Sequence, residues 1–180
     1  MINLTKAIFL DRDGVINESI VRDGKPYAPL SLAELKITTG AKEALKQLKQ
    51  AGYLLIVVTN QPDVGRGKVA QAIIESINQA LQQQLPLDAI EVCYHDDTAN
   101  CLCRKPKPGM MLQAAKKYQI DLTQSYLIGD RAKDVEAGQA AGCKTVWLES
   151  GYREPGPKAP PSFKASSLDQ AVQWILAKQE

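Results

Sequence analysis

Short apolar segments alternate with longer amphipathic segments along almost the whole chain. The apolar segments are rich in Val, Ile, Leu and aromatic residues, as expected of strands that are buried on both faces. They predict five β-strands, at residues 7–10, 53–58, 89–94, 125–128 and 144–148. Because helical segments separate these strands, the pattern is typical of a parallel sheet with helices on both of its faces.

The amphipathic segments repeat their apolar residues at helical spacing. They predict helices at residues 41–50, 69–83, 110–118 and 132–141. Near the C-terminus, Ser167-Leu168-Asp169-Gln170 resembles a capping box that opens a further helix. Residues 151–161 hold four prolines and two glycines, which predicts a loop. The whole pattern predicts that residues 1–180 form a single three-layer α/β domain with a parallel sheet.

Composition and charge narrow the possible partners. The chain has 180 residues, of which 44% are hydrophobic and 23% charged, as in an ordinary globular protein. A net charge of +2 is too small to indicate a nucleic acid or a membrane surface as the partner. No apolar run has the length of a membrane span, and the first residues do not resemble a signal peptide. We therefore expect a cytoplasmic protein, whose four cysteines are thiols or metal ligands.

Polar clusters follow the predicted strands or begin a helix between them. These clusters are Asp11-Arg12-Asp13-Gly14, Thr59-Asn60-Gln61, Arg104-Lys105-Pro106, and Gly129-Asp130-Arg131 with Asp134 one helical turn later. Ligands of parallel sheets bind at the carboxyl ends of the strands. The sequence therefore predicts that all four clusters meet at one edge of the sheet.

The chemistry of these clusters suits phosphoryl transfer. Asp11 and Asp13 lie two residues apart across a turn, so one can attack a substrate while the other exchanges a proton with the leaving group. Three carboxylates at one edge need a cation between them, and oxygen ligands favour Mg²⁺. Thr59 and Lys105 could neutralise the phosphoryl oxygens. Taken singly, each cluster could instead be an acidic turn, a helix cap or a solvated charge.

Four segments resemble the signature motifs of the haloacid dehalogenase (HAD) superfamily. They are Phe9-Leu10-Asp11-Arg12-Asp13-Gly14-Val15-Ile16-Asn17, Val58-Thr59-Asn60-Gln61, Lys105, and Gly129-Asp130 with Asp134. The resemblance implies an HAD-like fold and an aspartyl-phosphate mechanism. Asp11 would be the nucleophile, and Asp13 would act first as the acid and then as the base.

The resemblance also implies the metal site of the reaction. Mg²⁺ would be bound by Asp11, by the backbone carbonyl of Asp13 and by Asp130. Asp134 would orient Lys105 or a metal-bound water.

Core elements already occupy the intervals between the motifs, so we expect no large cap domain, and short loops must select the substrate.

One predicted loop, residues 93–103, holds three of the four cysteines and the only histidine. Cys93, His95, Cys101 and Cys103 can supply the three sulfurs and one nitrogen of a tetrahedral zinc site. With four protein ligands, Zn²⁺ would be structural and would hold the loop that precedes Lys105. Free thiols or a Cys101/Cys103 redox pair are the alternatives. We expect Cys143 to be a core residue.

The zinc loop and the catalytic motifs together resemble the D-glycero-D-manno-heptose 1,7-bisphosphate 7-phosphatases, which act on the pathway to heptose for lipopolysaccharide. The related histidinol-phosphate phosphatases, or a broad small-molecule phosphatase, are the alternative. The resemblance implies a monomeric enzyme with a phosphorylated sugar as its substrate. Asn60, Gln61, Arg66, Arg104 and Lys105 would bind that substrate. Arg66 matches the family's loop after Thr-Asn-Gln, and Arg104 beside Lys105 offers a second cation for a second phosphate. The segment Gln61-Pro62-Asp63-Val64 departs from the family pattern and adds a negative charge there.

Overall fold

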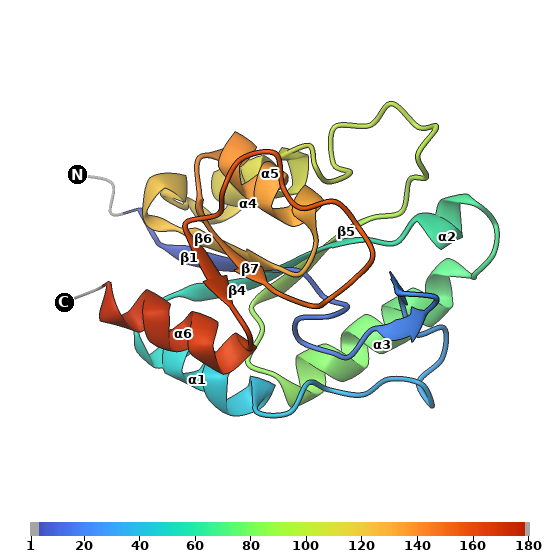
Figure 1. The fold of residues 1–180 in the computed structure, drawn as a ribbon, viewed down its shortest axis with the longest axis horizontal. Helices are drawn as coiled ribbons and strands as arrows, with labels where there is room; N and C mark the ends of the chain where they lie inside the picture. The colour runs from blue at the N-terminus through green and yellow to red at the C-terminus, as the bar shows by residue number, and fades with distance from the viewer. Residues whose placement is uncertain (1–3, 179–180) are drawn as a thin grey trace.

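The computed structural model describes residues 4–178 and contains a six-stranded parallel sheet (Figure 1). Its strands lie in the order β5-β4-β1-β6-β7-β8, and every neighbouring pair is parallel. The bounds are β1 Ala7–Leu10, β4 Leu54–Asn60, β5 Ala89–Cys93, β6 Tyr126–Gly129, β7 Lys144–Leu148 and β8 Phe163–Ala165. The prediction of a parallel α/β sheet is confirmed.

Helices cover both faces of the sheet, which gives three layers (Figure 1). On one face lie α1 Ala41–Gln50, α3 Gln71–Gln84 and α6 Leu168–Ala177. On the other face lie α4 Gly109–Tyr118 and α5 Ala132–Ala141. None of the helices within residues 4–178 is long and apolar enough to cross a membrane.

Strand β1 is the centre of the fold, and all four of its side chains are fully buried. Successive strand residues point to opposite faces of a sheet. Ile8 and Leu10 therefore pack against α1 and α6, whereas Ala7 and Phe9 pack in the second core, on the face of α4 and α5. A strand that is apolar at every position is the sequence signature of this two-sided burial.

Five short elements are not predicted by the sequence pattern. They are β8, the antiparallel hairpin of β2 Ile20–Arg22 and β3 Lys25–Tyr27, the helix α2 Pro62–Gly65 and the 3₁₀ turn η1 Leu122–Gln124. Each has only three or four residues, which are too few for a repeating hydrophobic pattern to be recognised. The hairpin residues are mostly exposed and lie between the strand predicted at residues 7–10 and the helix predicted at residues 41–50.

The topology places the end of β1 at a crevice of the sheet. The chain runs from β1 to β4 and β5 on one side, and then returns to β6, β7 and β8 on the other. In open α/β sheets, ligands bind at the carboxyl ends of the strands where the strand order reverses. Residues that follow β1, β4 and β6 therefore meet at one place.

Candidate active site

Asp11 directly follows β1 and is held by two donors on one of its carboxylate oxygens. Its Oδ1 accepts hydrogen bonds from Lys105 Nζ at 2.9 Å and from the backbone N–H of Arg12 at 2.9 Å. Among residues 4–178, no side chain or backbone group donates to Oδ2. Asp11 lines a cavity of about 490 Å³, so this second oxygen is available to a bound electrophile.

Lys105 is almost fully buried, and its ammonium group is surrounded by acceptors. It donates to Asp11 and to the backbone carbonyl of Val58 at 2.7 Å, and it forms an ion pair with Asp134 Oδ1 at 2.7 Å. Burial alone would lower the pKa of Lys105, but Asp11 and Asp134 outweigh it and raise that pKa above its ordinary value. The ammonium therefore stays charged throughout the neutral range.

The same contact acts on Asp11 in the opposite direction. Burial would raise the pKa of the Asp11 carboxyl, but the positive charge of Lys105 lowers it below the ordinary value. Asp11 is therefore ionised at neutral pH, as a carboxylate nucleophile must be.

The carboxylate of Asp13 is oriented by three neighbours. Arg12 donates from Nε at 3.1 Å, Asn17 from Nδ2 at 2.9 Å and Gln61 from Nε2 at 2.9 Å. Arg12 is itself completely buried and also binds Asn78. Asp13 is thus held at the wall of the cavity, two residues from Asp11, where it can exchange a proton with a bound group.

Thr59, Asn60 and Gln61 connect the end of β4 to the other parts of the site. Gln61 Nε2 donates to Thr59 Oγ1 at 2.9 Å as well as to Asp13. Asn60 pairs with the backbone N–H and carbonyl of Lys105 at 3.1 and 3.0 Å. Asn60 and Gln61 line the cavity, whereas Thr59 is buried and is not one of its lining residues. These side chains position Asp13 and Lys105 in addition to any contact with a substrate.

Asp130 follows β6, and one of its two carboxylate oxygens has no hydrogen-bond donor among the described residues. Its Oδ2 accepts a hydrogen bond from Tyr152 at 2.7 Å, whereas its Oδ1 is buried without a partner among residues 4–178. Oxygens of Asp11, Asp130 and Asp134 lie within 4.8 Å of one another, an arrangement that could hold a metal ion. Burial, and then the negative charges of Asp11 and Asp134, raise the pKa of Asp130 well above its ordinary value. A divalent cation would relieve this repulsion.

Gly14 and Gly129 make room for these carboxylates. Gly14 has a φ of +88°, and a Cβ there would lie 1.9 Å from Asp130 Oδ2. A Cβ on Gly129 would lie 2.2 Å from the Cβ of Asp134. Both contacts are closer than any side chain can tolerate, which explains the glycine of each motif in physical terms.

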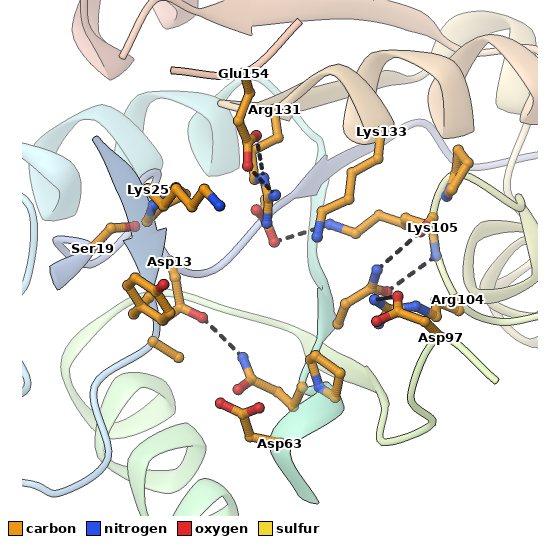
Figure 2. Close-up of a pocket in the computed structure, with 18 of the residues that line it drawn as sticks. Asp13, Ser19, Lys25, Asp63, Asp97, Arg104, Lys105, Arg131, Lys133 and Glu154 are labelled. Atoms are coloured by element: carbon orange, nitrogen blue, oxygen red, sulfur yellow. Dashed lines mark hydrogen bonds and ion pairs between the residues drawn. The ribbon is translucent and has the colours of Figure 1, made fainter. Parts of the chain in front are cut away.

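The cavity also contains cations to which the sequence pattern assigns no role. Lys133 and Arg131, from the start of α5, and Lys25, from β3, line it together with Lys105 (Figure 2). Arg131 is paired with Glu154, whereas Lys133 has no hydrogen-bond or ion-pair partner within residues 4–178. Burial and the neighbouring charge of Arg131 lower the pKa of Lys133. In the sequence, only the position of Lys133 one residue before Asp134 could have indicated that it belongs to the site.

Arg66 and Arg104 lie at one wall of the cavity and share a carboxylate. Both guanidinium groups form ion pairs with Asp97, and Arg66 also contacts Asp63 at 3.0 Å. Hydrogen bonds from Arg104 and Arg66 lower the pKa of Asp97, which is therefore ionised. Asp97 belongs to the loop between Cys93 and Cys103 and was not among the residues expected in the site.

The cysteine and histidine side chains of that loop converge. Ligand atoms of Cys93, His95, Cys101 and Cys103 all lie within 4.8 Å of one another. The distances between the pairs of these atoms in mutual contact run from 3.0 Å, for Cys103 to Cys93, to 3.8 Å, for Cys93 to Cys101. Bond lengths of about 2.0–2.3 Å to a central tetrahedral ion put its ligand atoms roughly 3.3–3.8 Å apart, so the group could hold a metal ion.

The thiols of the chain are all free, and their surroundings differ. Burial raises the pKa of the Cys93 thiol to about 12. Burial opposes ionisation of Cys101 as well, but the backbone N–H of Arg104 and neighbouring thiols lower the pKa of Cys101 to about 7. Cys143 lies buried in the core between the sheet and the helices α4 and α5, as expected.

Comparison with known proteins agrees with this geometry. The HAD-hydrolase-like family model matches residues 102–171. The chain is 42% identical over 152 residues to the D-glycero-β-D-manno-heptose-1,7-bisphosphate 7-phosphatase of Helicobacter pylori, which covers 81% of this chain and 84% of the relative. It is 34% identical over 182 residues to the enzyme of the same name from Escherichia coli K12, with 94% and 87% covered.

A solved structure with the same fold supports the same family. The D,D-heptose 1,7-bisphosphate phosphatase from B. bronchiseptica, complexed with magnesium and phosphate, superposes with a TM-score of 0.81 at 30% identity. The match covers 96% of this chain and 99% of the other. The chain therefore belongs to the HAD-like hydrolases and, within them, to the family of the heptose-1,7-bisphosphate 7-phosphatases.

Proposed function

We propose that this protein is a magnesium-dependent phosphatase that removes the C7 phosphate of D-glycero-D-manno-heptose 1,7-bisphosphate. The observation that carries the proposal is the ionised Asp11 at the cavity wall. Its Oδ1 is held by Lys105, and its Oδ2 has no hydrogen-bond donor within the part of the chain that the structure describes. Relatives at 34–42% identity that span most of the chain bear this enzyme's name, which supports the choice of substrate.

The first step transfers the phosphoryl group to the protein. Asp11 Oδ2 attacks phosphorus, the bond from phosphorus to the C7 oxygen breaks, and an aspartyl phosphate forms. The departing sugar oxygen takes a proton from Asp13, which its three neighbours hold at the cavity wall. Lys105 lies against Asp11 and would stabilise negative charge on the phosphoryl oxygens.

The second step releases phosphate. Asp13 is now a carboxylate, and it accepts a proton from the water that attacks phosphorus. The bond from phosphorus to Asp11 breaks, so Asp11 and inorganic phosphate are released. One residue thus serves as acid and then as base, which explains why Asp13 is fixed from several sides.

Asp11, the backbone carbonyl of Asp13, and Asp130 would hold the Mg²⁺ ion. Two observations fit a cation there: Asp130 Oδ1 has no partner among the described residues, and the three buried carboxylates repel one another. Bound Mg²⁺ supplies positive charge that neutralises the phosphoryl oxygens during transfer. Asp134 is committed to Lys105 and to the backbone N–H of Arg131, so it orients the lysine.

The second phosphate of the substrate would bind near Arg66 and Arg104. Guanidinium groups bind phosphate oxygens through paired hydrogen bonds. Both arginines line the same cavity as Asp11 and lie outside the group of carboxylates around Lys105. A substrate with a phosphate at each end could therefore contact both groups at once.

Zn²⁺ is the metal that best suits the loop at residues 93–103. Three thiolates and one imidazole are typical of a closed structural zinc site. Arg104 follows the last cysteine and donates to the carbonyl of His95 at 3.4 Å, so a fixed loop also fixes this arginine.

Four free thiols support a reducing compartment, the cytoplasm. A single chain supplies every proposed catalytic residue, which is consistent with a monomer.

A substrate comparison tests the proposed activity. We expect kcat/KM for heptose 1,7-bisphosphate to exceed that for histidinol phosphate by at least about tenfold, since only the former offers a second phosphate to the two arginines. Steady-state phosphate release in the presence of Mg²⁺ measures both values. Equal or faster turnover of histidinol phosphate would contradict the proposal.

Replacing Asp130 by Asn separates its role in metal binding from its effect on stability. Because the pKa of Asp130 is raised in the folded protein, its ionisation costs stability as the pH rises above 3.8. In metal-free protein at neutral pH, Asp130→Asn should increase the free energy of unfolding by about 1–2 kcal/mol, because it removes an uncompensated buried charge. Urea denaturation with and without Mg²⁺ measures this.

Mg²⁺ should stabilise the wild type but not this variant, and the variant should lose at least about 100-fold in kcat/KM. The control is Asp169→Asn, which removes a carboxylate from the first turn of α6. It should leave the response to Mg²⁺ intact. Full stabilisation of Asp130→Asn by Mg²⁺ would show that Asp130 is not a ligand.

The loop metal has its own test in Cys101→Ser. Wild-type protein should contain about one zinc ion per chain, and the variant should contain much less and lose several kcal/mol of unfolding free energy. Elemental analysis and denaturation provide the two readouts. Cys143→Ala, which removes the thiol outside the loop, should keep its zinc. If elemental analysis found no zinc in the purified wild-type protein, the loop assignment would be refuted.

A further inference from the structure

Asp97 lies between the two arginines that the proposed function assigns to the second phosphate. Its two carboxylate oxygens are divided between them, with Oδ2 on Arg66 and Oδ1 on Arg104. Figure 2 shows Asp97 and Arg104 together at one side of the cavity, while Lys25 enters from another. The carboxylate therefore occupies the position that an anionic group of a ligand would take.

The charges of this cluster already balance. Arg66 and Arg104 contribute two positive charges, and Asp63 and Asp97 contribute two negative ones. A phosphate that approached while Asp97 stayed in place would meet a neutral cluster. If Asp97 moved away, the remaining cluster would carry one net positive charge, and a phosphate would bind there more favourably.

The exposure of these side chains makes such an exchange feasible. The Asp97 side chain is 64% exposed, whereas those of Arg66 and Arg104 are 35% and 17% exposed. A displaced Asp97 carboxylate would return to water at little cost, because exposed ion pairs are weak. A phosphate offers more acceptor oxygens and up to two charges, so it would bind both arginines more tightly than the carboxylate does.

The backbone around Asp97 is held independently of this contact. Asp96 Oδ1 accepts hydrogen bonds from the backbone N–H groups of Thr98 and Ala99 and from the Thr98 hydroxyl. Cys93 and His95 precede this turn, and Cys101 and Cys103 follow it. Asp97 can therefore change its side-chain position while the loop keeps its shape.

We propose that Asp97 occupies the anion subsite of Arg66 and Arg104 in the free protein and is displaced by the distal phosphate of a sugar bisphosphate. This inference rests on the proposed function, which supplies a substrate with two phosphates. Asp97 is then a specificity-determining residue: it keeps the arginines paired until a dianionic group replaces it, and it weakens the binding of that group.

The experiment compares two substrates that differ only in the distal phosphate. KM is measured for heptose 1,7-bisphosphate and for heptose 7-phosphate with the wild type and with Asp97→Asn, which keeps the shape and removes the charge. The ratio of the KM for the bisphosphate to the KM for the monophosphate should fall about three- to tenfold in the variant. Asp169→Asn, which removes a charge elsewhere, should leave this ratio unchanged.

A second set of variants tests whether the effect of Asp97→Asn depends on the two arginines. With Arg66→Met and Arg104→Met both present, Asp97→Asn should no longer change the ratio, because the subsite for which it competes is gone. An unchanged ratio in the single variant would overturn the inference. A higher ratio would also overturn it and would mean that Asp97 holds the arginines in place for the phosphate. Equal zinc content in the wild type and in Asp97→Asn serves as the check that the loop is intact.

The outcome can be separated from that of the proposed function. Failure of the proposed function would appear in the wild type alone, as poor turnover of heptose 1,7-bisphosphate relative to histidinol phosphate. In that case, inhibition of p-nitrophenyl phosphate hydrolysis by fructose 1,6-bisphosphate and by fructose 6-phosphate gives the same ratio from inhibition constants. A ratio that Asp97→Asn leaves unchanged there would refute the role of Asp97.

Discussion

The buried ammonium group of Lys105 is the interaction on which the site depends. It joins Asp11 after β1, the carbonyl of Val58 in β4 and Asp134 in α5, so it connects three elements of the sheet edge. Removing the lysine alone would leave two buried carboxylates without a counter-charge, which is among the most costly changes a core can suffer. The same contact keeps Asp11 ionised, so one ion pair links the stability of the fold to its chemistry.

Much of this arrangement could be predicted from the sequence because it follows from the topology. Apolar strands that end in polar residues identify the sheet and its functional edge, and Asp11, Asp130 and Lys105 then meet without further assumptions. The cysteine and histidine spacing likewise predicts a group that could hold a metal, since the four ligands come from one short loop. In both cases the decisive contacts are set by local pattern or by strand order.

Other parts of the site depend on contacts that no local pattern encodes. Tyr152 reaches Asp130 from the proline-rich segment, which the sequence identifies only as a loop. Asp97 joins two arginines that lie 31 and 7 residues away along the chain. Gln61, expected to bind substrate, also donates to Asp13. Side-chain pairing across loops is decided by packing in three dimensions, so such partners become visible only in the structure.

Trapping the covalent intermediate is the sharpest test of Asp11 as the nucleophile. The protein would be mixed with heptose 1,7-bisphosphate and Mg²⁺, quenched in acid within milliseconds and digested for mass spectrometry; Asp11→Asn, which lacks the attacking carboxylate, is the control. We expect a phosphoryl group on Asp11 in the wild type and no adduct in Asp11→Asn. Phosphate release without any adduct in the wild type, or an adduct on another residue, would exclude Asp11 as the nucleophile.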